Sequence, residues 1–280
     1  MAYEAHVAGP ELAESLLGDR DAGQGAGLGR THLRHTVIAF VGMAFEASIA
    51  AGPGVLVFSR DSKHELATAA KNAARLGHRG IISFGVAGGL ASHLRPGDWV
   101  VASAIIESDK TVATDEAWSR RLRDAIKGSH HVPILGVDEP VAQPEDKQTL
   151  HRVTGAAAVD MESHVVARVA AAHGLAFTAL RVIVDPSDRA IPRAALLGMG
   201  AGPRADGAAV LRDLLARPSQ LPLLMRVSWD AYIARCAMQR VRRLLGPHFG
   251  LTDLGVSEAA GSDLVEGLES AEVASYRSPL

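Results

Sequence analysis

The stretch Ala157-Ala158-Val159-Asp160-Met161-Glu162-Ser163-His164, with Leu180-Arg181-Val182-Ile183-Val184-Asp185 downstream, decides the fold. The first piece is an apolar run that breaks into Asp-Met-Glu and continues as a helical pattern ending at Gly174. The second is a β-rich run that ends on the carboxylate of Asp185. Acids therefore follow two predicted strands, at the strand ends where ligands bind in open α/β sheets. A buried strand end is a costly position for an acid that has no function.

Strand and helix patterns alternate on both sides of this stretch. The predicted strands before it are 36–41, 55–58, 80–84, 99–106 and 132–136, and the predicted helices are 65–76, 115–126 and 145–154. This alternation predicts an α/β fold with a mostly parallel sheet covered on both faces. After Ala190 the pattern changes to a loop over 198–207, a short helix over 208–215 and a long amphipathic helix, Leu221 to Leu245.

Composition and charge narrow the class of protein. The 280 residues have a formal net charge of −2, so bulk electrostatics gives no reason to expect nucleic acid as a partner. A single cysteine, Cys236, excludes an intramolecular disulfide and a cysteine-based zinc cluster. No histidine stands in a metal-ligand pattern with carboxylates, and we expect no metal. Apolar runs are too short for a membrane span and no signal pattern opens the chain, so we expect a cytoplasmic protein.

The composition also suggests a division of the chain. We expect a flexible Gly-rich and charged segment at 1–35, a catalytic domain at 36–218, an amphipathic helical extension at 219–249 and an acidic, disordered tail at 250–280. The run Gly23-Gln24-Gly25-Ala26-Gly27-Leu28-Gly29 fails the dinucleotide-binding spacing, and no strand precedes it. We interpret that run as a linker.

Four motifs resemble the nucleoside phosphorylase/nucleosidase superfamily, above all its methylthioadenosine/S-adenosylhomocysteine nucleosidase branch. They occur in the family's order: Gly42-Met43-Ala44-Phe45-Glu46, Gly85-Val86-Ala87-Gly88-Gly89-Leu90, Val159-Asp160-Met161-Glu162-Ser163 and Arg181-Val182-Ile183-Val184-Asp185. The resemblance covers residues 36 to 190. It implies a three-layer α/β/α sandwich with a mixed, mostly parallel central sheet, to which this chain adds the C-terminal amphipathic helix.

A narrower resemblance is to the hopanoid-associated phosphorylase subgroup. The shared features include the loop after Ile82, Asp-Met-Glu-Ser-His, the turn from Asp185 to Arg189 and Arg217 to Pro222. That subgroup is associated with removing adenine from adenosylhopane, a triterpenoid joined to the 5′ carbon of adenosine. The resemblance therefore implies a 5′-substituted adenosine as substrate, adenine as product and no cofactor.

The resemblance assigns a role to each acid. Asp185 is the expected acid that protonates the leaving purine, and burial between apolar neighbours would raise its pKa; a turn cap is the alternative. Val184 replaces the family's Ser. Glu46 is the expected base that activates water. Glu162 is expected to accept from the ribose 2′- and 3′-hydroxyls; an acid in the first turn of a helix is the alternative.

The remaining expected substrate-binding residues lie near these acids in sequence. The resemblance assigns them to the ribose, to the backbone that approaches the ligand and to a purine-facing loop. They are Met43, Gly85, Val86, Ala87, Gly88, Pro140, Val141, Asp160 and Met161.

Water or phosphate as the nucleophile stays open from sequence. The hexameric phosphorylases of the superfamily use an Arg before the Gly-rich loop and a Ser within it, where this chain has Ser83 and Val86. Hydrolysis is favoured, with phosphate as co-substrate the alternative through Arg60, Arg79 or Arg95. A non-catalytic nucleoside- or lipid-binding protein is a further alternative, which the three acids disfavour.

The long C-terminal helix raises the question of a membrane. It carries five arginines against one acid, Asp230, and its residues Met225, Trp229, Tyr232, Ile233 and Cys236 lie near one stripe. We expect that stripe to face the protein. The basic face then either rests on anionic lipid, peripheral to the inner membrane, or is merely solvated. By resemblance we expect a homodimer.

Overall fold

A computed structural model describes residues 37–59, 80–193, 195–196 and 221–251. The chain divides into one unit over Met1–Gly250 and a second over Leu251–Leu280, and of the second only Leu251 is described. The predicted helices at 65–76 and 208–215 lie outside the described residues, as do both predicted tails except for Gly250 and Leu251.

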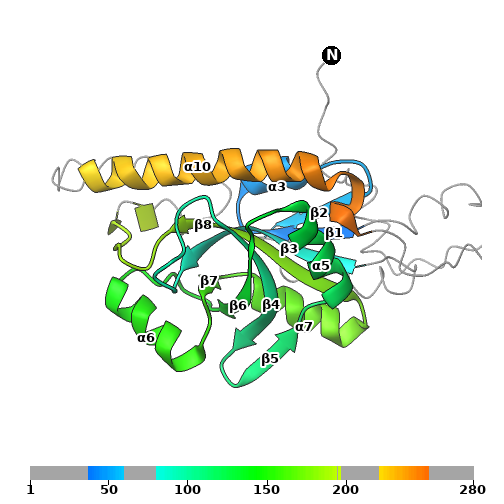
Figure 1. Cartoon of the computed structure of the whole chain (residues 1–280), viewed down its shortest axis with the longest axis horizontal. Coiled ribbons are helices and arrows are strands. Elements are labelled where there is room, and N and C mark those ends of the chain that lie inside the picture. The colour runs from blue at the N-terminus through cyan, green and yellow to red at the C-terminus, as the bar shows by residue number, and fades with distance from the viewer. Residues whose placement is uncertain (1–36, 60–79, 194, 197–220, 252–280) are drawn as a thin grey trace, which may run out of the picture. The chain divides into compact units, whose positions relative to one another are not determined.

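A central mixed sheet organises the larger unit (Figure 1). Its strands are β1 (Val37–Val41), β2 (Val55–Ser59), β3 (Gly80–Gly89), β4 (Trp99–Glu107), β5 (Lys110–Ala113), β6 (His130–Gly136), β7 (Ala158–Asp160) and β8 (Ala176–Asp185). The main path runs β2-β1-β3-β7-β6-β4-β5, and β8 pairs with both β3 and β4. Parallel pairing joins β1 to β2 and β3, β3 to β8, and β6 to β4 and β7. The predicted mixed, mostly parallel sheet is confirmed.

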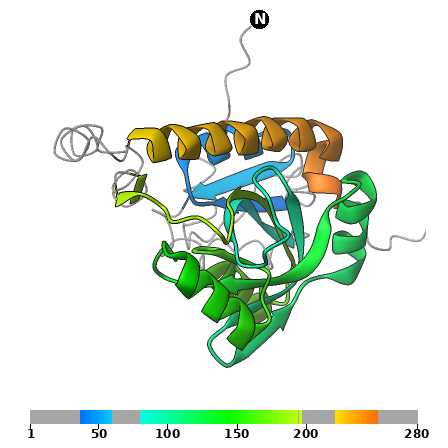
Figure 2. The ribbon, with the colours of Figure 1, turned by 60° about the vertical axis from the view of Figure 1, so that its left-hand side comes forward.

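Helices cover the sheet as its apolar strands require. They are α3 (Ala44–Ala50), α5 (Glu116–Ala125), α6 (Pro144–Thr154), α7 (Ser163–His173) and α10 (Leu221–Leu245), followed by the short η3 (Pro247–Gly250). The turned view shows α10 running along one side of the strands (Figure 2). Core strands such as β1 are buried along their whole length, which explains their unbroken apolar sequence.

Two details of the strands differ from the prediction. The Gly-rich stretch from Gly85 to Gly89 is not a loop, because β3 continues through it to Gly89. Partners on both sides hold it in the sheet: β8 runs parallel along it, and β7 pairs antiparallel with its last two residues. The short strand β5 was not predicted, since its four residues are mostly exposed and lack an apolar alternation.

Three residues of the predicted apolar stripe of α10 face outward, whereas Ile233 and Cys236 are half-buried, so the expectation that the whole stripe faces the protein was wrong. Met225, Trp229 and Tyr232 are 66%, 63% and 58% exposed. The buried positions are instead Asp230, Ala234, Met238, Val241 and Leu245, which recur every three or four residues and form the inner face. The helix was therefore predicted with the correct ends but rotated about its axis.

Candidate functional site

The site begins at the end of β1, where Glu46 folds back onto the backbone. Glu46 stands in the first turn of α3, and its Oε2 accepts hydrogen bonds from the N–H groups of Gly42 and Met43, both at 2.8 Å. Its Oε1 accepts from the N–H of Val86 on β3, also at 2.8 Å. The side chain is thereby fixed between two parallel strands.

Burial changes the acidity of this carboxyl group. Glu46 is only 1% exposed, and burial raises its pKa from 4.5 to about 7. The guanidinium of Arg181 opposes the increase, and the carboxylate of Glu162 adds to it. A carboxyl group with a pKa near neutrality is suited to act as a general base.

Arg181 lies at the centre of the site, although the sequence did not single it out as functional. Its side chain projects from β8 and is fully buried. Nε lies 2.6 Å from Oδ2 of Asp160, and Nη2 donates to the hydroxyls of Ser83 at 2.6 Å and Ser163 at 3.2 Å. Burial lowers the pKa of Arg181, but three carboxylates outweigh it and leave the pKa raised.

Glu162 lies beside Arg181 because the strand that precedes it, β7, pairs antiparallel with β3. Because β7 runs antiparallel to β3, the residues after it return along β3 instead of leaving the sheet edge. Glu162 is 7% exposed, and its Oε2 lies 3.6 Å from Nη2 of Arg181. A Cβ on Gly42 would stand 2.9 Å from Oε1 of Glu162, so this carboxylate lies directly against the backbone that anchors Glu46.

Gly85 and Gly88 bring β3 close to both halves of the site. A Cβ on Gly85 would meet Nη1 of Arg181 at 2.4 Å, and one on Gly88 would lie 3.2 Å from either oxygen of Asp185. Three residues of strand span about 10 Å. The acids Glu46 and Asp185 are therefore set apart along one strand, with backbone between them.

Asp185, at the end of β8, is paired with a buried lysine that the sequence did not identify. Nζ of Lys147 lies 2.5 Å from Oδ2 of Asp185. Burial raises the pKa of Asp185, while the nearby cations Lys147 and Arg189 oppose the increase. Lys147 stands in a polar helix, α6, whose sequence gives no sign of burial.

The other predicted substrate-binding residues differ in whether the structure places them near the acids. Both carboxylate oxygens of Asp160 already have partners inside the protein. Oδ1 accepts from the N–H of Ser163, and Oδ2 accepts from the Ser163 hydroxyl and forms an ion pair with Arg181. Its carboxylate is therefore used inside the protein. Val141 packs against a small apolar cluster around Leu135, whereas Pro140 is exposed and no described contact joins it to the acids.

Of three further predicted residues, Val86 bonds to Glu46 through its N–H, and the other two lie next to the acids by chain position. Val86 and Ala87 lie on β3 between the two glycines, and Met161 is half-buried between Asp160 and Glu162. The sequence therefore found the acids and the strand under them, but missed the two buried cations, Arg181 and Lys147.

Within the described ranges, no three His, Cys, Asp or Glu side chains group as metal ligands. In the same part of the chain, no helix is both long and apolar enough to cross a bilayer.

Comparisons with known proteins identify nucleosidases that are similar in sequence to part of this chain. The 5'-methylthioadenosine/S-adenosylhomocysteine nucleosidases of Mycobacterium bovis and Mycobacterium tuberculosis are each 38% identical over 86 residues. That match covers 31% of this chain and 31% of each relative, so the chain spans less than a third of the length of the curated relatives it matches.

Solved structures show the fold. The futalosine hydrolase of Helicobacter pylori covers 76% of this chain and 97% of its own, with 16% identity and a TM-score of 0.53. The 5'-methylthioadenosine/S-adenosyl homocysteine nucleosidase of the same organism covers 74% and 97%, with 16% identity and a TM-score of 0.51. The family profile described as "Phosphorylase superfamily" matches residues 43–197, which is more than half of the sequence. The chain belongs to the phosphorylase superfamily.

Proposed function

We propose that this protein hydrolyses the N-glycosidic bond of a 5′-substituted adenosine and releases adenine. The observation that carries the proposal is the grouping of Glu46 and Glu162 around Arg181, with Asp185 beside Gly88, three residues further along β3. Cleavage needs a base for the nucleophile, a partner for the sugar and an acid for the leaving purine. The three acids supply these functions from separate elements: Glu46 from α3, Glu162 from the start of α7 and Asp185 from the end of β8.

Each of the three acids carries out one step of the proposed reaction. Asp185 passes a proton to N7 of the purine as the bond from the sugar to N9 breaks and its electron pair moves to the base. Glu162 accepts hydrogen bonds from the ribose hydroxyls, which strengthen as positive charge grows on the sugar. Glu46 takes the proton of the water that attacks the anomeric carbon. Nη1 of Arg181 has no hydrogen-bond partner among the described residues and lies beside Glu46, where it can orient that water.

The charge balance around Arg181 favours water over phosphate. This one guanidinium already faces the carboxyl groups of Asp160, Glu162 and Glu46. A phosphate anion placed there would be repelled by more charges than attract it. Arg95, one of the arginines considered for phosphate, donates instead to the carbonyl of Leu94, and Arg60 and Arg79 lie outside the described residues.

Adenosylhopane is the substrate that we propose for this site. The support is the motif resemblance, together with the lack of any aromatic side chain from Pro186 to Met199, the segment that follows the acid. Bulky aromatics there would close the 5′ side of the sugar against a large lipid. We also infer a homodimer by resemblance, to be checked by light scattering on the purified protein.

The test is adenine release from adenosylhopane, or a long-chain 5′-alkyl adenosine, with and without phosphate. Adenosine with a free 5′-hydroxyl is the comparison substrate. Release without phosphate supports hydrolysis; release only with phosphate indicates a phosphorylase that forms a ribose 1-phosphate product. Binding without release under either condition would instead identify a non-catalytic binding protein.

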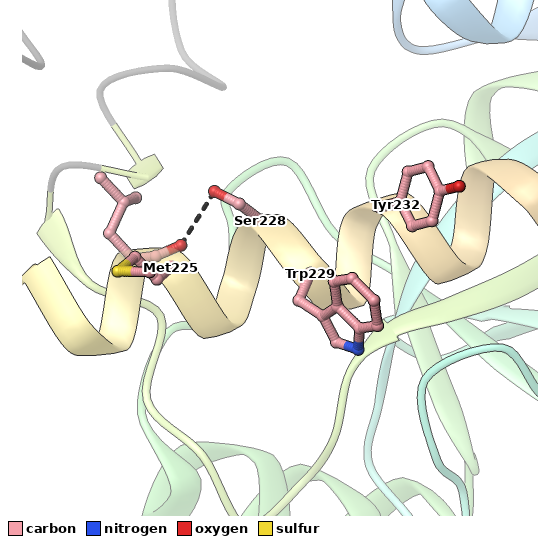
Figure 3. Close-up of a pocket in the computed structure, with 5 residues that line it drawn as sticks. Met225, Ser228, Trp229 and Tyr232 are labelled. Carbon is pink, nitrogen blue, oxygen red and sulfur yellow. Dashed lines mark hydrogen bonds between the residues drawn. The ribbon is translucent and has the colours of Figure 1, made fainter.

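We propose that α10 brings the enzyme to an anionic membrane surface. Its outward side chains line a groove of about 330 Å³, formed by Leu224, Met225, Ser228, Trp229 and Tyr232 (Figure 3). The rings of Trp229 and Tyr232 lie 5.7 Å apart, and aromatic rings of this kind favour the lipid headgroup region. None of the catalytic candidates lines this groove.

The charge of this helix supports an anionic membrane as the occupant of this face. Exposed arginines accompany the apolar residues along α10: Arg226, Arg235, Arg240 and Arg243. Asp230, the one acid of the helix, points inward and pairs with Arg189 at 2.5 Å. A second copy of this face would bring like charges together, whereas an anionic bilayer complements them.

Vesicle sedimentation tests this surface. We expect the protein to bind phosphatidylglycerol-containing vesicles more strongly than phosphatidylcholine vesicles, and Trp229→Ser with Tyr232→Ser to weaken that binding. Val153→Ser on α6 is the control, because Val153 is 78% exposed and lies on another helix. Equal binding to both vesicle types, or dimerisation that the two substitutions abolish, would contradict the proposal.

A further inference from the structure

Lys147 is a fully buried cation that the three-acid mechanism leaves unexplained. It lies on α6, and its side chain has no exposed area. Its ammonium donates to Oδ2 of Asp185 at 2.5 Å and to the backbone carbonyls of Pro186 and Arg189, both at 3.0 Å. All three N–H groups are therefore satisfied, as a buried ammonium requires.

This arrangement distinguishes the two oxygens of Asp185. Oδ2 is held by Lys147, so Oδ1 is the oxygen left for a ligand. The same ammonium ties down the turn from Pro186 to Arg189, which follows the acid directly. Lys147 therefore fixes both the rotation of the carboxyl group and the backbone that carries it.

The charges around Asp185 come from three elements. Lys147 approaches from α6, Arg189 from the turn after β8, and Asp230 from α10 through its ion pair with Arg189. Burial raises the pKa of Asp185, both cations oppose that increase, and Asp230 adds to it. Among the residues that the structure describes, Lys147 is the one cation in direct contact with the acid.

We propose that Lys147 is a positioning residue that orients Asp185 toward the purine and stabilises the carboxylate left after proton transfer. The O–H bond of Asp185 breaks, the N7–H bond forms, and the electron pair of the bond from the sugar to N9 leaves with adenine. The negative charge that appears on Asp185 then faces a fixed ammonium. This inference rests on the proposed function, because it requires Asp185 to act as the acid.

The test compares Lys147→Met and Lys147→Gln with Asp185→Asn and with the double variant Lys147→Met/Asp185→Asn. We expect kcat to fall about 10²-fold in either Lys147 variant, with KM changed only a few-fold. Without the ammonium the pKa of Asp185 increases, so the alkaline limb of the pH profile moves to higher pH. In the Asp185→Asn background, loss of Lys147 should cost at most a few-fold more.

Stability controls keep the result interpretable. Removing one member of a buried pair is destabilising, so every assay is run below the lowest Tm, and the double variant removes both charges together. Lys127→Met is the matched control, because Lys127 forms an exposed pair with Asp124 and should leave rate and pH profile unchanged.

Three results would overturn the inference, and they separate it from the proposed function. One is a normal kcat with an unmoved alkaline limb in the Lys147 variants while Asp185→Asn is inactive. Another is a decrease in kcat on substitution of Lys147 that is equally large in the wild-type and Asp185→Asn backgrounds, which would mean that Lys147 does not act through Asp185. An active Asp185→Asn enzyme would overturn both this inference and the acid on which the proposed function depends.

Discussion

The side chains of Arg181 and Glu46 both lie against the backbone of one residue of β3, Gly85. A Cβ at Gly85 would stand 2.4 Å from Nη1 of Arg181 and 2.6 Å from Oε1 of Glu46. The proposed base and the cation that orients its water can therefore both lie against this backbone position only because residue 85 has no side chain. This close approach, and not a need for backbone flexibility, explains glycine at that position.

Gly85→Ala should disable the enzyme. The added methyl group has to displace Arg181 or Glu46, and a displacement of about 1 Å in a catalytic group costs on the order of 10²-fold in rate. The measurement is kcat/KM for adenine release. Gly89→Ala is the control on the same strand, since its Cβ would meet neighbours at 3.5 Å or more. Equal rates for the two variants would show that Gly85 is not required.

Asp185→Asn should lower kcat by about 10² to 10⁴-fold, because the amide cannot pass a proton to the purine. Ligand binding should persist, since the proton moves mainly in the transition state. Adenine release and calorimetric binding of a 5′-alkyl adenosine measure the two effects. A near-normal rate would eliminate Asp185 as the acid.

Glu46 should set the acid limb of the pH profile. Its pKa is raised from 4.5 to about 7, so the base form disappears below neutrality and kcat/KM should fall there. Glu46→Gln should lose the limb together with most of the activity. A wild-type kcat/KM that does not change between about pH 5 and about pH 7 would contradict this assignment.

The raised pKa of Glu46 also predicts how the free energy of unfolding depends on pH. Because the folded state holds this proton more tightly than the unfolded chain, the stabilisation is complete below pH 4.5 and is lost as the pH rises through about 7. The loss amounts to roughly 3 kcal/mol for a shift of this size. Urea unfolding at several pH values should show a smaller decrease in Glu46→Gln, and an equal decrease would contradict the shift.

Asp230→Asn should destabilise the protein without touching the acids directly. Asp230 is 7% exposed and pairs with Arg189 at 2.5 Å, so loss of its charge leaves a partly buried guanidinium with only the more distant Asp188, at 4.0 Å. We expect the free energy of unfolding to decrease by about 1 to 3 kcal/mol. Asp124→Asn, which alters an exposed pair, should change it very little.

The sequence predicted the sheet and the acids because both have local signatures. Buried parallel strands such as β1 are continuous apolar runs, and an acid placed directly after such a run stands out. Glu162 and Asp185 stand out in this way, whereas Glu46 was selected only by the family resemblance. The helix from Leu221 to Leu245 was predicted with its observed ends.

The two buried cations could not be found in this way. Lys147 belongs to a helix of mostly polar residues, where a lysine normally indicates a solvated face, and only its contact with the end of β8 explains its burial. Arg181 stands inside an apolar strand, but its role depends on β7 returning antiparallel beside β3. Local patterns specify neither the direction of pairing nor the rotation of a long helix such as α10.

The pairing of Asp230 with Arg189 has a practical consequence for anyone who shortens this protein. The backbone carbonyl of Arg189 is one of the groups that hold Lys147, and Lys147 holds Asp185. Trp118 of α5 likewise donates its indole N–H to the carbonyl of Phe249, just past α10. A truncation before Leu221 would therefore remove supports of the proposed acid and uncover the core, and a minimal catalytic fragment has to extend through Gly250.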